Sequence, residues 1–205
     1  MKLRQLEMVL EGLQGFGRPD PSREQYRTPA PLAARLLFDA FMQGDIENRR
    51  VCDLGCGTGV LAIGAGLLGA GEVTGVDSDK DALRIAGENA VTAGVAIGFL
   101  RSDISDPLLP GRAGHADTVV MNPPFGAQKQ HADRPFIDCA LNIADVIYGI
   151  FNAGSVPFVR SYTAGRASVE GRARGTLRIP HQFSFHTRTH VDIGVEILRI
   201  TRNAG

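Results

Sequence analysis

RVCDLGCGTG, residues 50–59, places Val51, Cys52 and Leu54 shortly before a glycine-rich turn. The first five residues have the length and composition of a buried strand. Glycines at positions 55, 57 and 59 let the backbone bend sharply, and they let a ligand approach it without an intervening side chain. Apolar residues 60–69 follow with helical character. The stretch therefore predicts a strand, a ligand-binding turn and a helix.

Polar side chains follow the next two predicted strands at the points where they end. Residues 73–76 form an apolar strand that ends on Asp77, and a helix is expected over 79–93. A carboxylate at that strand end is placed to accept hydrogen bonds from both hydroxyls of a ribose. The third strand, 97–100, ends near Asp103 and Ile104. Asp103 can accept from an adenine amino group while Ile104 packs on the ring, so this edge of the sheet predicts a nucleoside site.

MNPPFG, residues 121–126, follows the apolar strand 116–120. Two consecutive prolines donate no backbone hydrogen bonds, and Pro124 holds Pro123 extended. The Asn122 side-chain oxygen and the Pro123 carbonyl can then project together beside the flat face of Phe125. Two acceptors next to an aromatic ring suit a planar group that carries an NH2. The alternative is a Pro-Pro turn that ends a strand, with Phe125 in the core.

The N-terminal part is expected to be helical. Leucines recur at helical spacing over residues 2–14, and glycines and prolines then make a loop. The stretch EQYRTPAPLAARLL, residues 24–37, predicts a helix that starts at Thr28 and runs to Met42. Gln25, Tyr26 and Thr28 are then polar groups at the start of a helix, either as ordinary caps or as part of a site.

The C-terminal part predicts a helix over 136–144, a strand over 146–151, a helix over 155–164 and two strands, 169–179 and 191–197, joined by loop 180–190. Strand–helix alternation that closes on a hairpin indicates a doubly wound α/β sheet. From residue 155 onward the chain contains eight arginines and three acidic residues, a surplus of five positive charges. Strand alternation puts Arg172, Arg174 and Arg178 on one face, which suits phosphate contacts or a solvated surface.

Composition excludes several classes of protein. With 205 residues, 43% apolar and 21% charged, the chain is expected to be one globular domain. Its net charge is zero, so the overall charge does not point to any particular partner. Three cysteines without a CxxC pair indicate reduced thiols in the cytoplasm. The longest apolar stretch, 59–71, is too short and glycine-rich for a membrane span, and Glu7 and Glu11 do not fit a signal peptide. No metal site is expected, because His181, His186 and His190 fall in a loop and strand edge without a nearby cysteine.

The string DLGCGTG, with Asp77 after the next strand, resembles the first motif of class I S-adenosylmethionine-dependent methyltransferases. Its G-x-G-x-G spacing differs from the G-x-G-x-x-G fingerprint of NAD sites. In that superfamily an Asn-Pro-Pro-aromatic motif ends the fourth strand of enzymes that methylate planar amino groups. The resemblance implies a Rossmann-like, mostly parallel seven-stranded sheet that ends in an antiparallel hairpin, with S-adenosylmethionine as cofactor.

The match extends to EQYRTP, VDSDKDAL, MNPPFG and HQFSFHTRTHVDIGVEILRI. Together these resemble the small methyltransferase-like family that makes N6-methyladenosine in small-subunit ribosomal RNA; the likeness is weakest over residues 150–178. It implies methyl transfer to N6 of an adenosine in ribosomal RNA by a single domain, 1–205. Residues 1–45 would form a helical cap that contributes to the cofactor site. Members commonly work with a small zinc-binding activator subunit, which is therefore a candidate partner.

Carried over by position, the resemblance implies two sets of site residues. The catalytic set is Asn122, Pro123, Pro124 and Phe125. The cofactor contacts are Gln25, Thr28, Asp53, Gly55, Gly57, Thr58, Gly59, Val60, Asp77, Asp103 and Ile104. Hydrogen bonds from an adenine amino group to Asn122 and the Pro123 carbonyl would aim its nitrogen lone pair at the methyl group, so catalysis is chiefly positioning and electrostatics.

Three alternatives remain at this point. Similar motifs occur in enzymes that methylate guanine N2 in RNA and in enzymes that methylate a glutamine amide of release factors. The glutamine enzymes usually carry tyrosine in the fourth position, so Phe125 and EQYRTP favour adenine. The third alternative is an RNA-binding assembly factor that kept the fold. Such a factor would have lost the catalytic activity. The presence of Asn122, Asp77 and the glycine turn argues against this, because a protein that only binds RNA would not require all of them.

Overall fold

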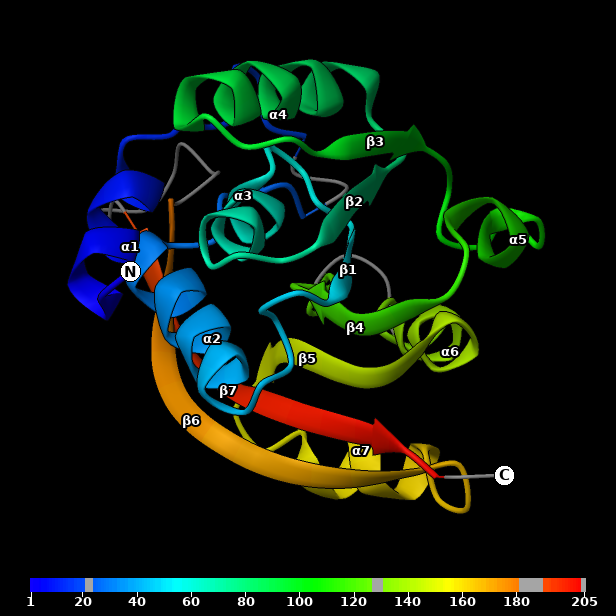
Figure 1. The fold of residues 1–205 in the computed structure, drawn as a ribbon. Helices are drawn as coiled ribbons and strands as arrows, with labels where there is room; N and C mark the ends of the chain where they lie inside the picture. Colours follow the sequence, from blue (N-terminus) through cyan, green and yellow to red (C-terminus); the bar gives the residue numbers. More distant parts are fainter. Residues whose placement is uncertain (21–23, 127–130, 181–189, 204–205) are drawn as a thin grey trace.

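One seven-stranded sheet forms the centre of the computed structural model, which describes residues 1–20, 24–126, 131–180 and 190–203 (Figure 1). The strand order is β3-β2-β1-β4-β5-β7-β6. Strands β1 to β5 run parallel, β7 is antiparallel to β5, and β6 is antiparallel to β7. Their bounds are β1 (Arg50–Leu54), β2 (Glu72–Asp77), β3 (Gly98–Arg101), β4 (Ala116–Met121), β5 (Ala144–Asn152), β6 (Ala167–Pro180) and β7 (His190–Arg202). The expected doubly wound, mostly parallel sheet with a closing hairpin is confirmed.

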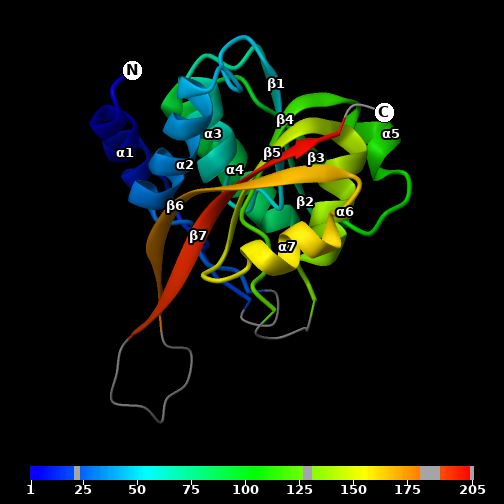
Figure 2. The ribbon, with the colours of Figure 1, turned by 90° about the horizontal axis from the view of Figure 1, so that it is seen from below.

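Helices cover both faces of this sheet (Figures 1 and 2). One face carries α1 (Leu3–Glu11), α2 (Ala30–Met42), α3 (Val60–Leu67) and α4 (Lys80–Ala93). The other face carries α5 (Leu109–Ala113), α6 (Arg134–Ile143) and α7 (Val156–Tyr162). Successive strand residues point to opposite faces. In β4, Val120 accordingly belongs to the core under α2 and α3, whereas Val119 belongs to the core under α6.

Local sequence explains where α4 begins and ends. The Asp79 side chain accepts hydrogen bonds from the backbone N–H groups of Asp81 and Ala82, at 2.8 and 3.2 Å, and so caps the helix. Gly94 ends it in the left-handed conformation, at a φ of 69°. This cap holds the end of β2 and the start of α4 in a tight turn beside the site described below.

Strand β6 departs from the uninterrupted alternation expected over residues 169–179. Its pairing with β7 shifts between Gly171 and Ala173, which leaves Arg172 as an extra residue. Val169 packs in the core under α7, whereas Ala173 and Leu177 pack in the core under α2. The bulge therefore moves the odd-numbered residues from one face to the other. Beyond it, the β6–β7 ribbon extends away from the body of the sheet (Figure 2).

Other differences from the sequence prediction concern short elements. The first helix ends at Glu11 instead of residue 14, and the helix expected over 155–164 spans Val156–Tyr162. Helix α5, at Leu109–Ala113, was not expected from the sequence, because a five-residue helix with a proline and a glycine carries no periodic signal. No helix in the described ranges is both long and apolar enough to cross a membrane.

Candidate active site

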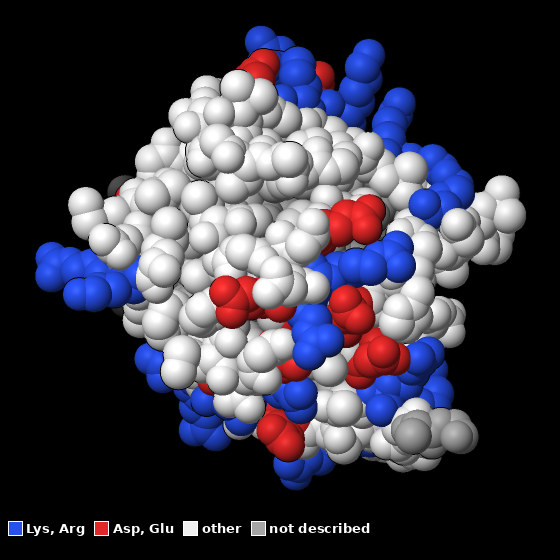
Figure 3. All heavy atoms as spheres, in the orientation of Figure 1, with Lys and Arg blue, Asp and Glu red and all other residues white. Residues whose placement is uncertain are grey.

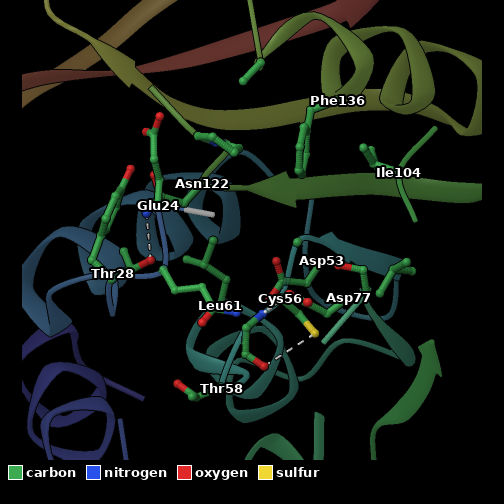
Figure 4. Close-up of a pocket in the computed structure, with 18 of the residues that line it drawn as sticks. Glu24, Thr28, Asp53, Cys56, Thr58, Leu61, Asp77, Ile104, Asn122 and Phe136 are labelled. Carbon is green, nitrogen blue, oxygen red and sulfur yellow. Dashed lines mark hydrogen bonds between the residues drawn. The ribbon is translucent and has the colours of Figure 1, made fainter. Parts of the chain in front are cut away.

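A cavity of about 530 Å³ opens where the parallel strands β1, β2 and β4 end. Its wall is formed by five parts of the chain: the segment before α2, the glycine turn after β1, the ends of β2 and β3, the end of β4, and the start of α6. In Figure 4, Glu24, Thr28 and Asn122 gather on one side, Asp53, Asp77 and Thr58 on another, and the Phe136 ring faces the space between them. Crevices at the carboxyl ends of parallel strands are the usual ligand sites of open α/β sheets.

The glycine turn is packed so closely that side chains would not fit. The Gly55 and Cys56 N–H groups donate to the Val76 carbonyl at 2.8 and 2.9 Å, which ties the turn to β2. Gly57 has a φ of 53°, and a Cβ atom there would lie 2.8 Å from the ring of Phe16. A Cβ at Gly55 would lie equally close to the ring of Phe136. Gly55 and Gly57 therefore contribute backbone alone to the cavity wall, next to these two rings.

Asp77 lies at the end of β2, as expected, and faces the cavity. One carboxylate oxygen accepts the Gly57 N–H at 2.8 Å and the other accepts the Asp79 N–H at 2.9 Å. Burial raises the pKa of Asp77, and these backbone hydrogen bonds oppose the rise. Each oxygen keeps a further lone pair that can accept a ligand hydroxyl.

Asp53 lies under the turn with only 1% of its surface exposed. Its Oδ2 accepts the Ala62 N–H at 2.9 Å, whereas Oδ1 is buried without a partner among the described residues. Burial raises the pKa of Asp53 to about 8, and the nearby Asp77 adds to the rise. Burial thus favours the protonated form of this side chain, which lies in the cavity wall.

Gln25 and Thr28 do not serve as ordinary helix caps. The Gln25 Nε2 donates to Asp79 Oδ2 at 2.7 Å, and its Oε1 accepts the Asp20 N–H at 2.8 Å. The Thr28 hydroxyl accepts a hydrogen bond from Asn122 Nδ2 at 3.0 Å. Helix α2 begins at Ala30 with Pro29 at its N-cap and no side-chain capping bond. Both residues belong to the cavity wall instead.

The motif of residues 122–125 follows β4 at the same edge of the sheet. Asn122 Oδ1 is buried and has no hydrogen-bond partner in the described part of the chain. Asn122 and Pro124 line the cavity, whereas Pro123 and Phe125 are not part of its wall. The Phe125 ring stacks on Tyr26 with centroids 5.6 Å apart. An unpartnered buried acceptor in a ligand cavity is the feature expected of a residue that binds an N–H group.

The remaining expected residues also meet here. Thr58, Val60, Asp103 and Ile104 line the cavity, and Gly59 caps α3 next to it at a φ of 87°. Several further residues of the cavity wall were not expected from the sequence; among them are Phe16, Glu24, Phe136 and His131. The sequence does indicate that the Phe125 N–H needs an acceptor, because it is the first backbone donor after two prolines. Glu24 is that acceptor.

The arginines of β6 do not form the single basic face that was expected. Arg172 contacts Asp39 on α2 through two hydrogen bonds of 2.8 and 3.0 Å. Arg174 lies beyond the bulge and alternates with Ala173 and Gly175, which face α2, so it points the other way. The Arg178 side chain lies outside the described part of the structure. On the lower half of the face seen in Figure 3, acidic and basic side chains are interspersed.

Metal ligands were not expected from the sequence. Within the described ranges, no group of three or more His, Cys, Asp and Glu side chains is arranged to hold a metal ion. His181 and His186 lie outside those ranges, and His190 starts β7.

Comparison with known proteins agrees with this arrangement. Residues 31–143 match the family model described as the methyltransferase small domain. The chain belongs to this methyltransferase family. The methyltransferase is 34% identical to the rRNA N(6)-adenosine-methyltransferase METTL5 of Danio rerio, over 98% of this chain and 99% of that protein. It is 40% identical to an uncharacterised protein of Methanocaldococcus jannaschii, over 98% and 95% of the two chains.

A solved structure is similar over the whole length of the methyltransferase. The crystal structure of a candidate RNA methyltransferase from Pyrococcus horikoshii superposes with a TM-score of 0.90 at 39% identity, covering 100% of this chain and 99% of that one. S-adenosylmethionine is the cofactor of this family. The cavity fits it, because the bare glycine turn and the Asp77 carboxylate offer the backbone and the acceptor that a nucleoside needs.

Proposed function

We propose that this methyltransferase transfers a methyl group to N6 of an adenosine in ribosomal RNA. The observation that carries the proposal is Asn122 Oδ1, a buried acceptor without a partner among the described residues, in the wall of the cofactor cavity. The names of full-length relatives from three animals support the same acceptor. We propose that residues 1–205 act as one domain, with 1–45 contributing to the cofactor site.

The roles of the chain's own residues follow from their chemistry. Asp77, Asp53, Gln25 and the glycine turn would hold S-adenosylmethionine, which would supply a methyl group on a positively charged sulfur. Asn122 Oδ1 and the Pro123 carbonyl accept the two N–H groups of the adenine. This favours a pyramidal nitrogen whose lone pair is free to attack. The proton on the alkylated nitrogen is acidic and leaves without a dedicated strong base.

The acceptor base has to leave its stack to reach such a cavity. In the proposal Pro124 keeps Pro123 extended. Phe125 lies outside the cavity wall with one face stacked on Tyr26, and we propose that its other face stacks on the unpaired base. A small zinc-binding activator subunit is proposed as a partner on the basis of the family resemblance alone. Location in the cytoplasm is part of the same proposal, supported by three buried free thiols at Cys52, Cys56 and Cys139.

The test uses radiolabelled S-adenosylmethionine with separated small-subunit RNA, large-subunit RNA and release factor, each with and without an activator subunit. Labelled RNA is digested to nucleosides and separated. We expect N6-methyladenosine from small-subunit RNA. Methylguanosine, or label in release factor, would replace the adenine assignment with one of its two rivals. No transfer to any of these substrates would favour a binding factor instead of an enzyme.

A further inference from the structure

The non-helical segment before α2 lies along the acceptor side of the cavity, and its alternate residues contact the motif that follows β4. Glu24, Tyr26 and Thr28 all reach residues 122–125. Gln25, between them, points to Asp79 on the opposite side. Figure 4 shows Glu24 and Thr28 next to Asn122. One short segment thus serves two halves of the site with alternating side chains.

The motif depends on such side-chain contacts because of its prolines. Pro123 and Pro124 have no N–H groups, so Phe125 carries the first backbone donor after Asn122. Glu24 Oε2 accepts that N–H at 2.7 Å, and Asn152 Nδ2 donates to the Phe125 carbonyl at 3.1 Å. Both polar groups of the Phe125 backbone are therefore held by side chains from distant segments.

The Asn122 carboxamide is held in the same way. Only its oxygen can accept an N–H, and a rotation of 180° would present two N–H donors to the acceptor amine instead. Thr28 is 8% exposed and takes the hydrogen bond of Asn122 Nδ2, which leaves Oδ1 directed away from Thr28 and unpartnered among the described residues. Without Thr28, the Nδ2 group would lack a partner and both orientations would become accessible.

We propose that Glu24 and Thr28 are positioning residues for methyl transfer. Thr28 fixes the orientation of the Asn122 carboxamide, and Glu24 fixes the backbone of Phe125. The expected effect on kcat rests on the proposed function, whereas the two positioning hydrogen bonds do not depend on it. It differs from the expectation that Thr28 is a cofactor contact, because it assigns Thr28 to the acceptor side.

The kinetic test compares Thr28→Val, Thr28→Ser and a matched control, Thr92→Val, on the exposed face of α4. In Thr28→Val we expect kcat to fall about tenfold, as for the loss of one hydrogen bond that orients a reacting group. The S-adenosylmethionine Kd should change by less than about twofold, and Thr28→Ser should restore kcat. The double variant Thr28→Val/Asn122→Ala should have the same kcat as Asn122→Ala alone, since Thr28 acts through Asn122.

A weaker cofactor Kd with an unchanged kcat in Thr28→Val would make Thr28 a cofactor contact and overturn its assignment. Additive losses in the double variant would do the same. If the wild type methylates no adenosine, the proposed function fails. The inference is then decided by hydrogen exchange, which needs no substrate.

In that exchange experiment the Phe125 backbone amide is followed by NMR in wild type, Glu24→Ala and Glu24→Gln. The amide should exchange at least about tenfold faster in Glu24→Ala, because its acceptor is gone, and Glu24→Gln should retain most of the protection. The Asn122 side-chain NH2 should likewise lose protection in Thr28→Val but not in Thr92→Val. Unchanged protection at both groups would overturn the proposal.

Discussion

Replacing Asp53 by asparagine should change how the stability of the protein depends on pH. Burial raises the pKa of Asp53 from 3.8 to about 8 in the folded protein. Between these values the folded protein holds a proton that the unfolded chain has lost, so the free energy of unfolding falls as pH rises. The stabilising contribution is complete below about pH 4 and is lost as pH approaches 8. From pH 5 to 8, three units at about 1.4 kcal/mol each amount to about 4 kcal/mol.

Asparagine cannot ionise, and its oxygen can still accept the Ala62 N–H that Asp53 accepts at 2.9 Å. The assay is urea unfolding of wild type and Asp53→Asn at pH 5, 6, 7 and 8. The variant should gain about 4 kcal/mol relative to wild type across this range. Asp106→Asn is the control: a hydrogen bond from the Leu108 N–H lowers the pKa of Asp106, so it is ionised in both states throughout. A difference between Asp53→Asn and wild type that does not vary with pH would show that folding does not raise the pKa of Asp53.

Three further substitutions probe the cofactor site, the glycine turn and strand β6. Asp77→Ala should raise the S-adenosylmethionine Kd at least tenfold by calorimetry, since charged hydrogen bonds contribute about 1.5–3 kcal/mol; an unchanged Kd would remove it from the site. Gly57→Ala should lower Tm, with a strain of about 1 kcal/mol from its φ of 53° and added overlap with Phe16 at 2.8 Å; an unchanged Tm would contradict this. Arg172→Met should lower Tm but leave the salt dependence of RNA binding unchanged, because Asp39 holds its guanidinium; a flatter salt slope would place Arg172 on the RNA.

Much of the fold was predictable because its signals are local. The glycine turn of residues 55–59, the carboxylate that ends β2 and the Asn-Pro-Pro-Phe motif each lie within a few residues of the strand that positions them. Parallel strands end at a common edge, so these motifs had to meet there. The cavity confirms that meeting for Asp77, Asp103 and Asn122.

What could not be predicted depends on contacts between distant parts of the chain. Glu24 and Phe125 are separated by 101 positions, and Thr28 and Asn122 by 94. No periodic pattern reports such pairs, so the polar residues before α2 were compatible with ordinary capping. The β6 bulge was hidden for a different reason. Gly171 and Ala173 are small enough to fit either face, and the shift is visible only from their partners on β7.

If Asn122 orients the amino group of an adenosine for methylation, Asn122→Ala should abolish most of the transfer. Wild type and variant are incubated with S-adenosylmethionine and small-subunit ribosomal RNA, and the digested RNA is assayed for N6-methyladenosine. We expect an unchanged cofactor Kd and a rate at least about 100-fold lower, the usual scale for losing one preorganised polar group at a reacting centre. A variant that makes N6-methyladenosine at the wild-type rate would show that Asn122 does not orient the amino group.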